Sequence, residues 1–379
     1  MVSQTSPEPP RAVAWWLLAC CALVFAMVVV GGITRLTHSG LSIVEWQPLV
    51  GAVPPLNERQ WEETFGRYKL TPEFRLSNHD MTLEGFKSIF WWEYVHRLLG
   101  RFVGAVFLLP FVHFLWRRAI APPLAWKLAG IFVLGGLQGA LGWYMVKSGL
   151  VDDPRVSPVR LAAHLGLALL IYAAMLWIAL ELLRVPLRGN RGQTPLSAAQ
   201  NAESVPGSAK HAAVVRGFVA LVFVMVLSGA LVAGIRAGLA YNTFPLMNGA
   251  WIPPEVLEID PWWKNFVYNM ATVQLVHRTL ALVIVAVALI AWWRVHADRS
   301  APLAACRWSE ALLAVVALQV TAGIATLLLR VPIPLAALHQ AGAVLVFTCA
   351  IGLLDSLSRA ARTDRLLPAA PVRERHGPR

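Results

Sequence analysis

The sequence is poor in charge and in cysteine. Only 14% of its 379 residues are Asp, Glu, Lys or Arg, against roughly a quarter in soluble domains, and 57% are hydrophobic. The four cysteines lie in or beside apolar stretches without the spacing of a metal site, which excludes a disulfide framework and a zinc site. This composition is typical of a polytopic membrane protein, so the net charge of +12 informs membrane orientation and does not indicate nucleic-acid binding.

Eight apolar stretches are each long enough to cross a bilayer as a helix, which takes about 20 residues. They lie near 13–32, 95–115, 126–146, 161–183, 214–235, 272–293, 309–329 and 335–354. No cleavage signal follows the first stretch and no transit peptide precedes it, so we expect a retained span in a bacterial inner membrane. An N-terminus in the cytoplasm places 18 of the 33 Lys and Arg on the inside, but only 8 of the 21 Asp and Glu. This bias predicts that both termini are cytoplasmic.

The second half of the chain repeats motifs of the first. Val95-His96-Arg97 recurs as Val276-His277-Arg278, and Leu161-Ala162-Ala163-His164 resembles Leu335-Ala336-Ala337-Leu338-His339. Because each unit has an even number of spans, both units keep the same orientation in the membrane. The predicted fold is all-α, with eight transmembrane helices arranged as two tandem four-helix bundles in a parallel pseudo-twofold repeat.

This repeat sets the predicted domain boundaries. We expect a cytoplasmic N-terminus (1–12), an N-terminal half (13–183) with a long outer loop (33–94), a cytoplasmic linker (184–213), a C-terminal half (214–354) and a cytoplasmic tail (355–379). In the outer loop, Asn57 and the apolar spacing of Trp61, Phe65 and Tyr68 predict a capped amphipathic surface helix. A second surface turn is predicted from Thr82 to Phe90, and either element could be a lid or a simple anchor.

Four histidines stand at the starts of the even-numbered spans and at one predicted depth near the outer face: His96, His164, His277 and His339. A lone histidine at this depth is usually an interfacial residue, but matching positions in two repeats indicate a shared role. Two facing helices that each supply one imidazole form a bis-histidine site for heme iron. The residue four positions after each histidine is small, which leaves room for a porphyrin face or lets the helices pack closely.

The two halves differ three residues before the first histidine of each half, where Glu93 is matched by Gln274. A carboxyl group near a porphyrin edge can exchange protons and an amide cannot, so Glu93 is the candidate catalytic residue. The alternative is that Glu93 only stabilises a helix N-terminus. Four arginines at the predicted outer rim are candidates for binding porphyrin propionates or lipid phosphates: Arg35, Arg97, Arg236 and Arg278.

Taken together, these motifs resemble the heme A synthase family over nearly the whole chain. They comprise Gly31-Gly32-Ile33-Thr34-Arg35-Leu36-Thr37, Ser39-Gly40-Leu41-Ser42, Trp46 and Pro48, Glu93-x-x-His96-Arg97, His164, Asn242-Thr243-Phe244-Pro245-Leu246-Met247 with Gly249, His277-Arg278 and His339. The pattern is similar to the mitochondrial and proteobacterial-type branch. The cysteine pair that other bacterial members carry in the first outer loop is absent.

The resemblance implies an oxidoreductase that converts the C8 methyl of heme O to a formyl group through two hydroxylations, giving heme A for a terminal oxidase. It implies that His277 and His339 ligate a resident heme b, and that His96 and His164 face the substrate heme beside a catalytic Glu93. The implied partners are heme O as substrate, the farnesyltransferase that makes heme O, an unidentified electron-transfer partner and the lipid membrane, with a homo-oligomer left open. A carrier that holds two hemes without chemistry and a quinol-linked b-type cytochrome subunit are the alternatives.

Overall fold

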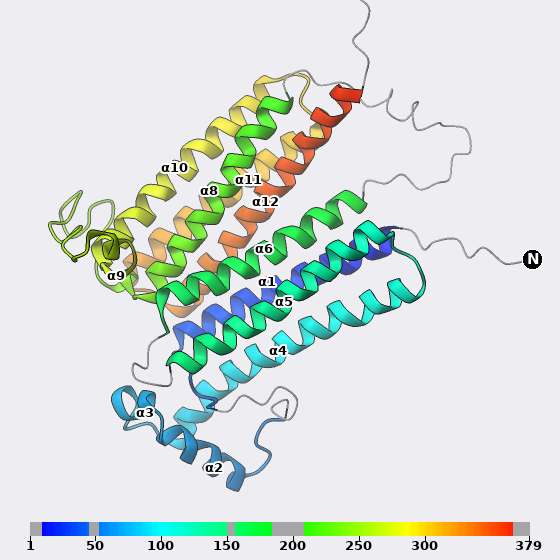
Figure 1. Ribbon diagram of the computed structural model, residues 1–379. Coiled ribbons are helices and arrows are strands. Elements are labelled where there is room, and N and C mark those ends of the chain that lie inside the picture. Colours follow the sequence, from blue (N-terminus) through cyan, green and yellow to red (C-terminus); the bar gives the residue numbers. More distant parts are fainter. Residues whose placement is uncertain (1–9, 45–52, 150–155, 184–207, 367–379) are drawn as a thin grey trace, which may run out of the picture.

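The computed structural model describes residues 10–44, 53–149, 156–183 and 208–366, and it is built almost entirely of helices (Figure 1). Within these ranges eight helices are long and apolar enough to span a membrane, as the sequence predicted. They are α1 (Pro10–Leu36), α4 (Leu83–Trp116), α5 (Pro122–Gly149), α6 (Pro158–Leu182), α8 (Ser208–Gly234), α10 (Met270–Ala297), α11 (Leu303–Leu328) and α12 (Ile333–Leu366). The predicted linker overlaps the start of α8, and its part at 184–207 lies outside the described residues.

The helices pack in two sets of four. In the first set α1 contacts α4 and α6, and α5 contacts α4 and α6; in the second set α8 contacts α10 and α12, and α11 contacts α10 and α12. The two sets meet along α1, α6, α8 and α12, whose buried side chains form one continuous apolar core. Large apolar side chains of the outer helices remain exposed, such as Trp126 at 79% and Leu318 at 70%, which suits contact with lipid.

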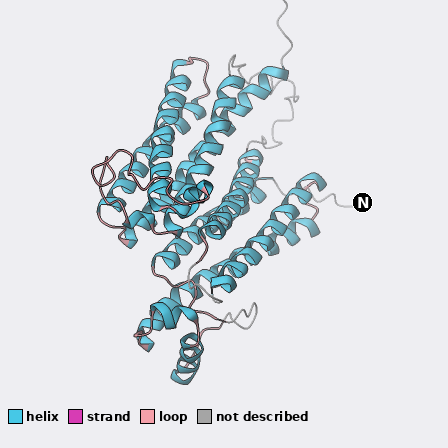
Figure 2. Cartoon of the chain, turned by 60° about the vertical axis from the view of Figure 1, so that its left-hand side comes forward, coloured by secondary structure: helices cyan, strands magenta, loops and turns pink. Residues whose placement is uncertain are grey.

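The two long loops lie at the same end of the molecule (Figure 1), which we call the loop end. The first carries α2 (Glu58–Lys69) and α3 (Pro72–Ser77), and the second carries η2 (Ala237–Leu239), η3 (Trp262–Lys264) and α9 (Asn265–Tyr268). Figure 2, turned by 60°, shows both loops again at the ends of the long helices.

The predicted amphipathic helix is α2, which begins with a side-chain cap. The Asn57 side chain accepts a hydrogen bond from the Gln60 backbone N–H (3.0 Å), and the Gln60 side chain accepts one from Leu56 (2.7 Å). The apolar face of α2 contains Trp61, Phe65 and Tyr68. It packs on Phe86, Ile89, Phe90 and Tyr94 of α4 and forms a small aromatic core with them.

The prediction of a separate surface turn from Thr82 to Phe90 was wrong. Thr82 is the N-cap of α4, and residues from Leu83 onward continue without a break into the membrane-spanning part of that helix. The charged residues Glu84 and Lys87 lowered the local hydropathy, but Phe86, Ile89 and Phe90 keep a helical spacing and are buried. Helix α4 therefore extends beyond the other helices and supports α2.

Polar contacts join the two sets of helices near the loop end. Arg35 of α1 donates from Nη2 to the carbonyls of Ala233 and Gly234 (both 3.1 Å), which are the last two residues of α8. Gln340 of α12 donates to the Val28 carbonyl of α1 (2.8 Å). These bonds join α1 of the first set to α8 and α12 of the second set.

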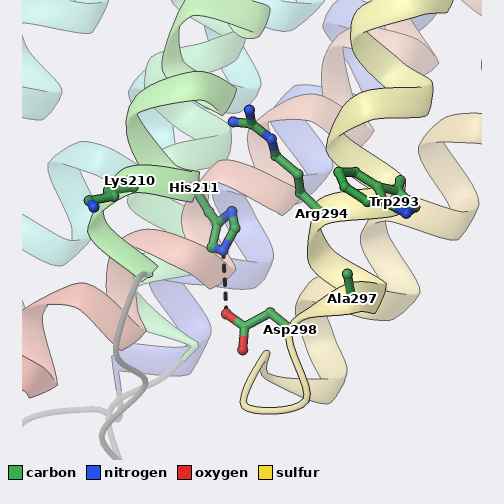
Figure 3. A pocket seen from close by; sticks show the side chains of 6 residues that line it. All are labelled: Lys210, His211, Trp293, Arg294, Ala297 and Asp298. Carbon is green, nitrogen blue, oxygen red and sulfur yellow. Dashed lines mark ion pairs between the residues drawn. The ribbon is translucent and has the colours of Figure 1, made fainter.

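The opposite end of the molecule carries two shallow surface hollows. One, of about 360 Å³, lies between the start of α8 and the end of α10, where His211 and Asp298 form an ion pair at 3.3 Å (Figure 3). Figure 3 shows that the side chains of Lys210 and Arg294 extend away from this pair. The other is lined by Leu303, Ala304, Arg307 and Trp308. Neither hollow adjoins the four histidines.

Candidate functional site: paired histidines at the loop end

The four predicted histidines lie on four different helices at the loop end of the molecule. His164, His277 and His339 are near the N-terminal ends of α6, α10 and α12, while His96 lies well inside α4 because that helix is extended. All four side chains are half-buried. A charge on His164 would act on His96, and a charge on His339 would act on His277, so the two imidazoles of each half are neighbours.

The helices that carry each histidine pair have their main contacts with other helices and not with each other. Helices α4 and α6 are both supported by α1 and α5, and α10 and α12 are both supported by α8 and α11. This arrangement suits a flat ligand that enters between the two imidazole-bearing helices. Within the described ranges no group of three or more His, Cys, Asp and Glu side chains could hold a metal, and the candidate iron ligands are the two imidazoles of each half.

Each histidine ring packs on a glycine of a neighbouring helix. A Cβ added to these glycines would lie 3.0 Å from His96 at Gly31, 3.0 Å from His164 at Gly142, 3.3 Å from His277 at Gly229 and 2.7 Å from His339 at Gly323. The glycines thus provide the space that the rings occupy. The sequence analysis gave none of the four this role, although Gly142 and Gly323 stand at matching places in the two halves, four residues after the pairs Leu137-Gln138 and Leu318-Gln319.

The two histidines of the second half have hydrogen-bond partners at Nδ1. His277 Nδ1 lies 2.8 Å from the hydroxyl oxygen of Ser228, and His339 Nδ1 lies 3.1 Å from the backbone carbonyl oxygen of Gln319. A partner at Nδ1 orients the ring and leaves Nε2 as the nitrogen available to a metal. Sequence reasoning missed Ser228 and Gln319 in this role because nothing in their spacing relates them to the histidines.

The two histidines of the first half lack such partners. His164 Nδ1 is buried without a hydrogen bond, and none of the described residues forms a hydrogen bond with the His96 ring. A buried ring nitrogen without a partner is costly unless a ligand completes the site. The glycine-lined ring positions and the paired imidazoles fit the binding of an iron porphyrin.

Glu93 is buried, at 2% exposed, and is surrounded by donors. Its Oε2 accepts hydrogen bonds from the Ser42 hydroxyl (2.7 Å) and the Ile43 backbone N–H (2.8 Å), and its Oε1 pairs with Arg97 at 2.5 Å. The carboxylate therefore ties the segment after α1 to α4. Its position three residues before His96 keeps it on the side of α4 that carries the histidine.

Gln274 makes the matching contacts in the second half. It is 3% exposed, its amide donates to the Ala237 carbonyl (2.7 Å), and its Oε1 accepts from Arg278 (2.7 Å). The contact with the arginine four residues later is thus kept in both halves, and only the charge differs. Both residues have a structural role, and Glu93 can add proton chemistry to it.

The four candidate propionate arginines all bind protein groups in this structure. Arg97 also donates to the Ile43 carbonyl (2.9 Å), Arg236 contacts His38 (3.1 Å), and Arg278 donates to the carbonyls of Tyr241 and Thr243 (both 2.9 Å). Arg35 and Arg278 nevertheless each keep a buried Nε without a partner. These two arginines can offer a further donor to an anionic group.

His38, which follows α1, is surrounded by cations. Burial lowers the pKa of its imidazole to about 4, and the charges of Arg236 and Arg35 act in the same direction. His38 is therefore neutral at physiological pH and accepts the hydrogen bond from Arg236. This cationic group lies where the two halves meet at the loop end.

The fold and the site define a multi-pass membrane protein that presents one pair of imidazoles in each set of four helices. A family described as "Cytochrome oxidase assembly protein" matches residues 14–351. The chain is 54% identical over 354 residues to the heme A synthase of Nitrosospira multiformis, covering 92% of this chain and 94% of the relative. It is 51% identical over 358 residues to the heme A synthase of Nitrosomonas eutropha (94% and 97% covered) and 47% identical over 350 residues to that of Parvibaculum lavamentivorans (92% and 95%). The chain belongs to the heme A synthase family of cytochrome oxidase assembly proteins.

Proposed function

We propose that this protein is a membrane oxidoreductase that converts heme O to heme A by oxidising the C8 methyl group to a formyl group. The proposal rests chiefly on the similarity to proteins named heme A synthase over more than nine-tenths of the chain. The paired imidazoles at the loop end support it, because both a resident heme and a heme substrate need iron ligands. We assign His96 and His164 to the substrate heme, and His277 and His339 to a heme b.

The resident heme b would supply one-electron transfer, which is the chemistry that two imidazole ligands favour on heme iron. The residues of the second half would hold this group in place: His277 and His339 would bind it through Nε2, and Arg278 would offer its buried Nε–H to a propionate. Arg35 is the corresponding donor that we propose for the first half. Arg97 and Arg236 are weaker candidates because the structure shows them bound to Glu93 and His38.

Glu93 is the residue that we propose to move protons during the oxidation. Conversion of a methyl to a formyl group is a four-electron oxidation that adds one oxygen atom; with water as the oxygen source it releases four protons, which a base near the reacting edge must accept, while the electrons pass to the electron-transfer partner. Glu93 is the buried carboxylate on the histidine-bearing helix of the first half, and Arg97 stabilises its charge. To accept a proton it must loosen one of its contacts with Ser42, Ile43 or Arg97.

The proposal extends to the internal repeat, the membrane orientation and the partner of the protein. We propose that the second set of four helices is a tandem repeat of the first, within the domain boundaries given above, and that the protein lies in the bacterial inner membrane with the loop end outside and both termini in the cytoplasm. The excess of Lys and Arg at the opposite end supports this orientation. The enzyme that makes heme O is the proposed partner that supplies the substrate.

A charge swap tests the role of Glu93. Glu93→Gln keeps an oxygen acceptor for Ser42 and Arg97 and removes the charge, while Gln274→Glu is the matched change in the other half. We expect Glu93→Gln to abolish heme A formation in extracted hemes and Gln274→Glu to leave it largely intact. Normal heme A formation in folded Glu93→Gln protein would exclude the catalytic role and favour a non-catalytic heme carrier.

Histidine variants test the division between the halves. We expect His277→Ala and His339→Ala to lose the heme b spectrum of the purified protein, and His96→Ala and His164→Ala to keep it while heme A formation stops. Equal loss of heme b from all four variants would contradict the assignment and favour a cytochrome with two resident hemes.

A further inference from the structure

The hydroxyl of Ser228 sets the orientation of the His277 ring. Ser228 is 8% exposed in α8, and its hydroxyl lies 2.8 Å from both the Met225 carbonyl oxygen and His277 Nδ1. The single hydroxyl proton of Ser228 is donated to the Met225 carbonyl, so the Ser228 oxygen accepts a hydrogen bond from His277 Nδ1–H. The lone pair of His277 is then at Nε2, on the side of the ring away from α8.

His339 is fixed in the same tautomer by a different partner. Its Nδ1 faces the backbone carbonyl oxygen of Gln319, which can only accept, so Nδ1 carries the proton. The Gln319 side chain also donates to the His339 carbonyl (2.8 Å), which holds α11 and α12 together at this point. Both rings of the second half are therefore preset to bind a metal through Nε2.

The first half has no hydroxyl in the corresponding place. The segment Val24-Phe25-Ala26-Met27-Val28-Val29-Val30-Gly31 matches Val222-Phe223-Val224-Met225-Val226-Leu227-Ser228-Gly229, with identical Val, Phe, Met, Val and Gly positions. The two glycines that end these segments both pack on the first histidine of their half. Val30 thus occupies the position of Ser228 and offers no partner to the His96 ring.

The ring orientations agree with this difference. His277 faces Gly229 with Cε1 and Nδ1, whereas His96 faces Gly31 with Nε2 and Cδ2. His96 therefore presents Nε2 to α1, whereas His277 presents Nδ1 to α8. His164, the other histidine of the first half, has a buried Nδ1 without a hydrogen-bond partner.

We propose that Ser228 is a positioning residue that holds His277 with Nε2 ready for heme iron, and that Val30 in its place leaves His96 free to turn, so that the first site exchanges its heme. The inference rests on the proposed function and adds a physical reason for one heme to stay and the other to leave. Outer partners of this kind contribute about 10- to 100-fold to metal affinity. A hydrogen-bonded imidazole is also a stronger donor to iron and lowers the reduction potential.

The test uses the full-length protein in detergent, loaded with iron protoporphyrin IX. We expect Ser228→Ala to release its heme to apomyoglobin about 10- to 100-fold faster than the unaltered protein and to show a higher midpoint potential. Ser228→Thr keeps the hydroxyl and should restore both values. Val30→Ser is the reciprocal variant, and we expect it to slow the release of heme from the first site.

His277→Ala separates the possible failures. If His277→Ala keeps its heme, the ligand assignment in the proposed function is wrong. If His277→Ala loses heme but Ser228→Ala matches the unaltered protein in release rate and potential, only the positioning role is refuted. If Ser228→Thr fails to restore the potential that Ser228→Ala changes, the effect comes from packing and the hydroxyl has no such role.

Discussion

Replacing Gly323 by alanine should displace the His339 ring and weaken the binding of the heme b that we propose for the second half. The new Cβ would lie 2.7 Å from His339 Cε1 and 3.2 Å from Nδ1, closer than a carbon side chain tolerates. The ring cannot rotate away without losing the hydrogen bond from Nδ1 to the Gln319 carbonyl. Overpacking by a methyl group costs about 1–3 kcal/mol. Because the ring can relieve the clash by leaving its ligating position, we expect this cost to fall on the heme-bound state, where it corresponds to roughly 5- to 150-fold weaker binding.

Two of the other histidine-facing glycines allow a graded comparison with Gly323. Gly142→Ala would place its Cβ 3.0 Å from His164, and Gly229→Ala would place its Cβ 3.3 Å from His277. Gly229→Ala should therefore disturb the His277 ring less than Gly323→Ala disturbs the His339 ring. Gly139 lies one turn before Gly142 in α5, and a Cβ there has no atom within 4 Å. Gly139→Ala is therefore the control, and it should stabilise the helix by about 0.5–1 kcal/mol.

The measurement compares heme content per protein and the rate of heme transfer to apomyoglobin, with thermal unfolding measured alongside. We expect heme loss to follow the order Gly323→Ala, then Gly229→Ala, then Gly139→Ala, while the unfolding temperatures change little. A Gly323→Ala protein that is folded and holds heme as tightly as Gly139→Ala would refute the idea that the glycines shape the ring positions.

Three further changes test the packing around the site. Burial raises the pKa of the Glu73 carboxyl from 4.5 to about 7. Between these two values the folded state holds a proton that the unfolded chain has lost, so the stability of the α2–α3 region should fall by about 3 kcal/mol as pH rises from 4.5 through 7. Glu73→Gln should remove that slope in thermal unfolding at pH 5 and pH 8, and an unchanged slope would contradict the assignment. Gly32→Ala would place a Cβ 1.9 Å from the Gln340 amide oxygen and break the hydrogen bond from this side chain to the Val28 carbonyl. We expect the free energy of unfolding in denaturant titrations to fall by about 1 kcal/mol. No change would show that this contact does not join the halves. Asn265 is fully buried and forms hydrogen bonds with the backbone of Ile259 and Trp262. Asn265→Ala should therefore destabilise the second loop by about 2–3 kcal/mol and speed its cleavage by protease. An unaltered cleavage rate would contradict this prediction.

The eight spans and the capped helix α2 could be predicted because they depend on local signals. Apolar length alone identifies a span, and Asn57 with its aromatic spacing identifies α2. The boundaries were less well predicted: α4 begins before the predicted span at 95, and α8 begins inside the predicted linker. In both cases polar residues on one side of a continuing helix lowered the hydropathy without ending the helix. The short helix α3 was also missed.

The positions of the four histidines at one end could be predicted, but their surroundings could not. Ser228 and His277 are separated by 49 positions, and only the packing of α8 on α10 brings them together. The same applies to the contact of Glu93 with Ser42, which depends on the path of the chain after α1. Repeat matching would have identified Val30 and Ser228 as a difference between the halves, although not what the difference does.

The two differences between the halves act on different properties of the site. Exchange of Glu93 for Gln274 changes the charge beside a histidine while the contact with Arg97 or Arg278 is kept. Exchange of Val30 for Ser228 leaves the charge unchanged and affects only the freedom of the imidazole. An enzyme whose substrate and product are both hemes must release one iron from its ligands at every turnover, and release rates respond strongly to such small changes at a site. The proposed function therefore requires proton chemistry and loose ligation in the same half, and in this chain the buried carboxylate of Glu93 and the His96 ring without a hydrogen bond both lie in the first half.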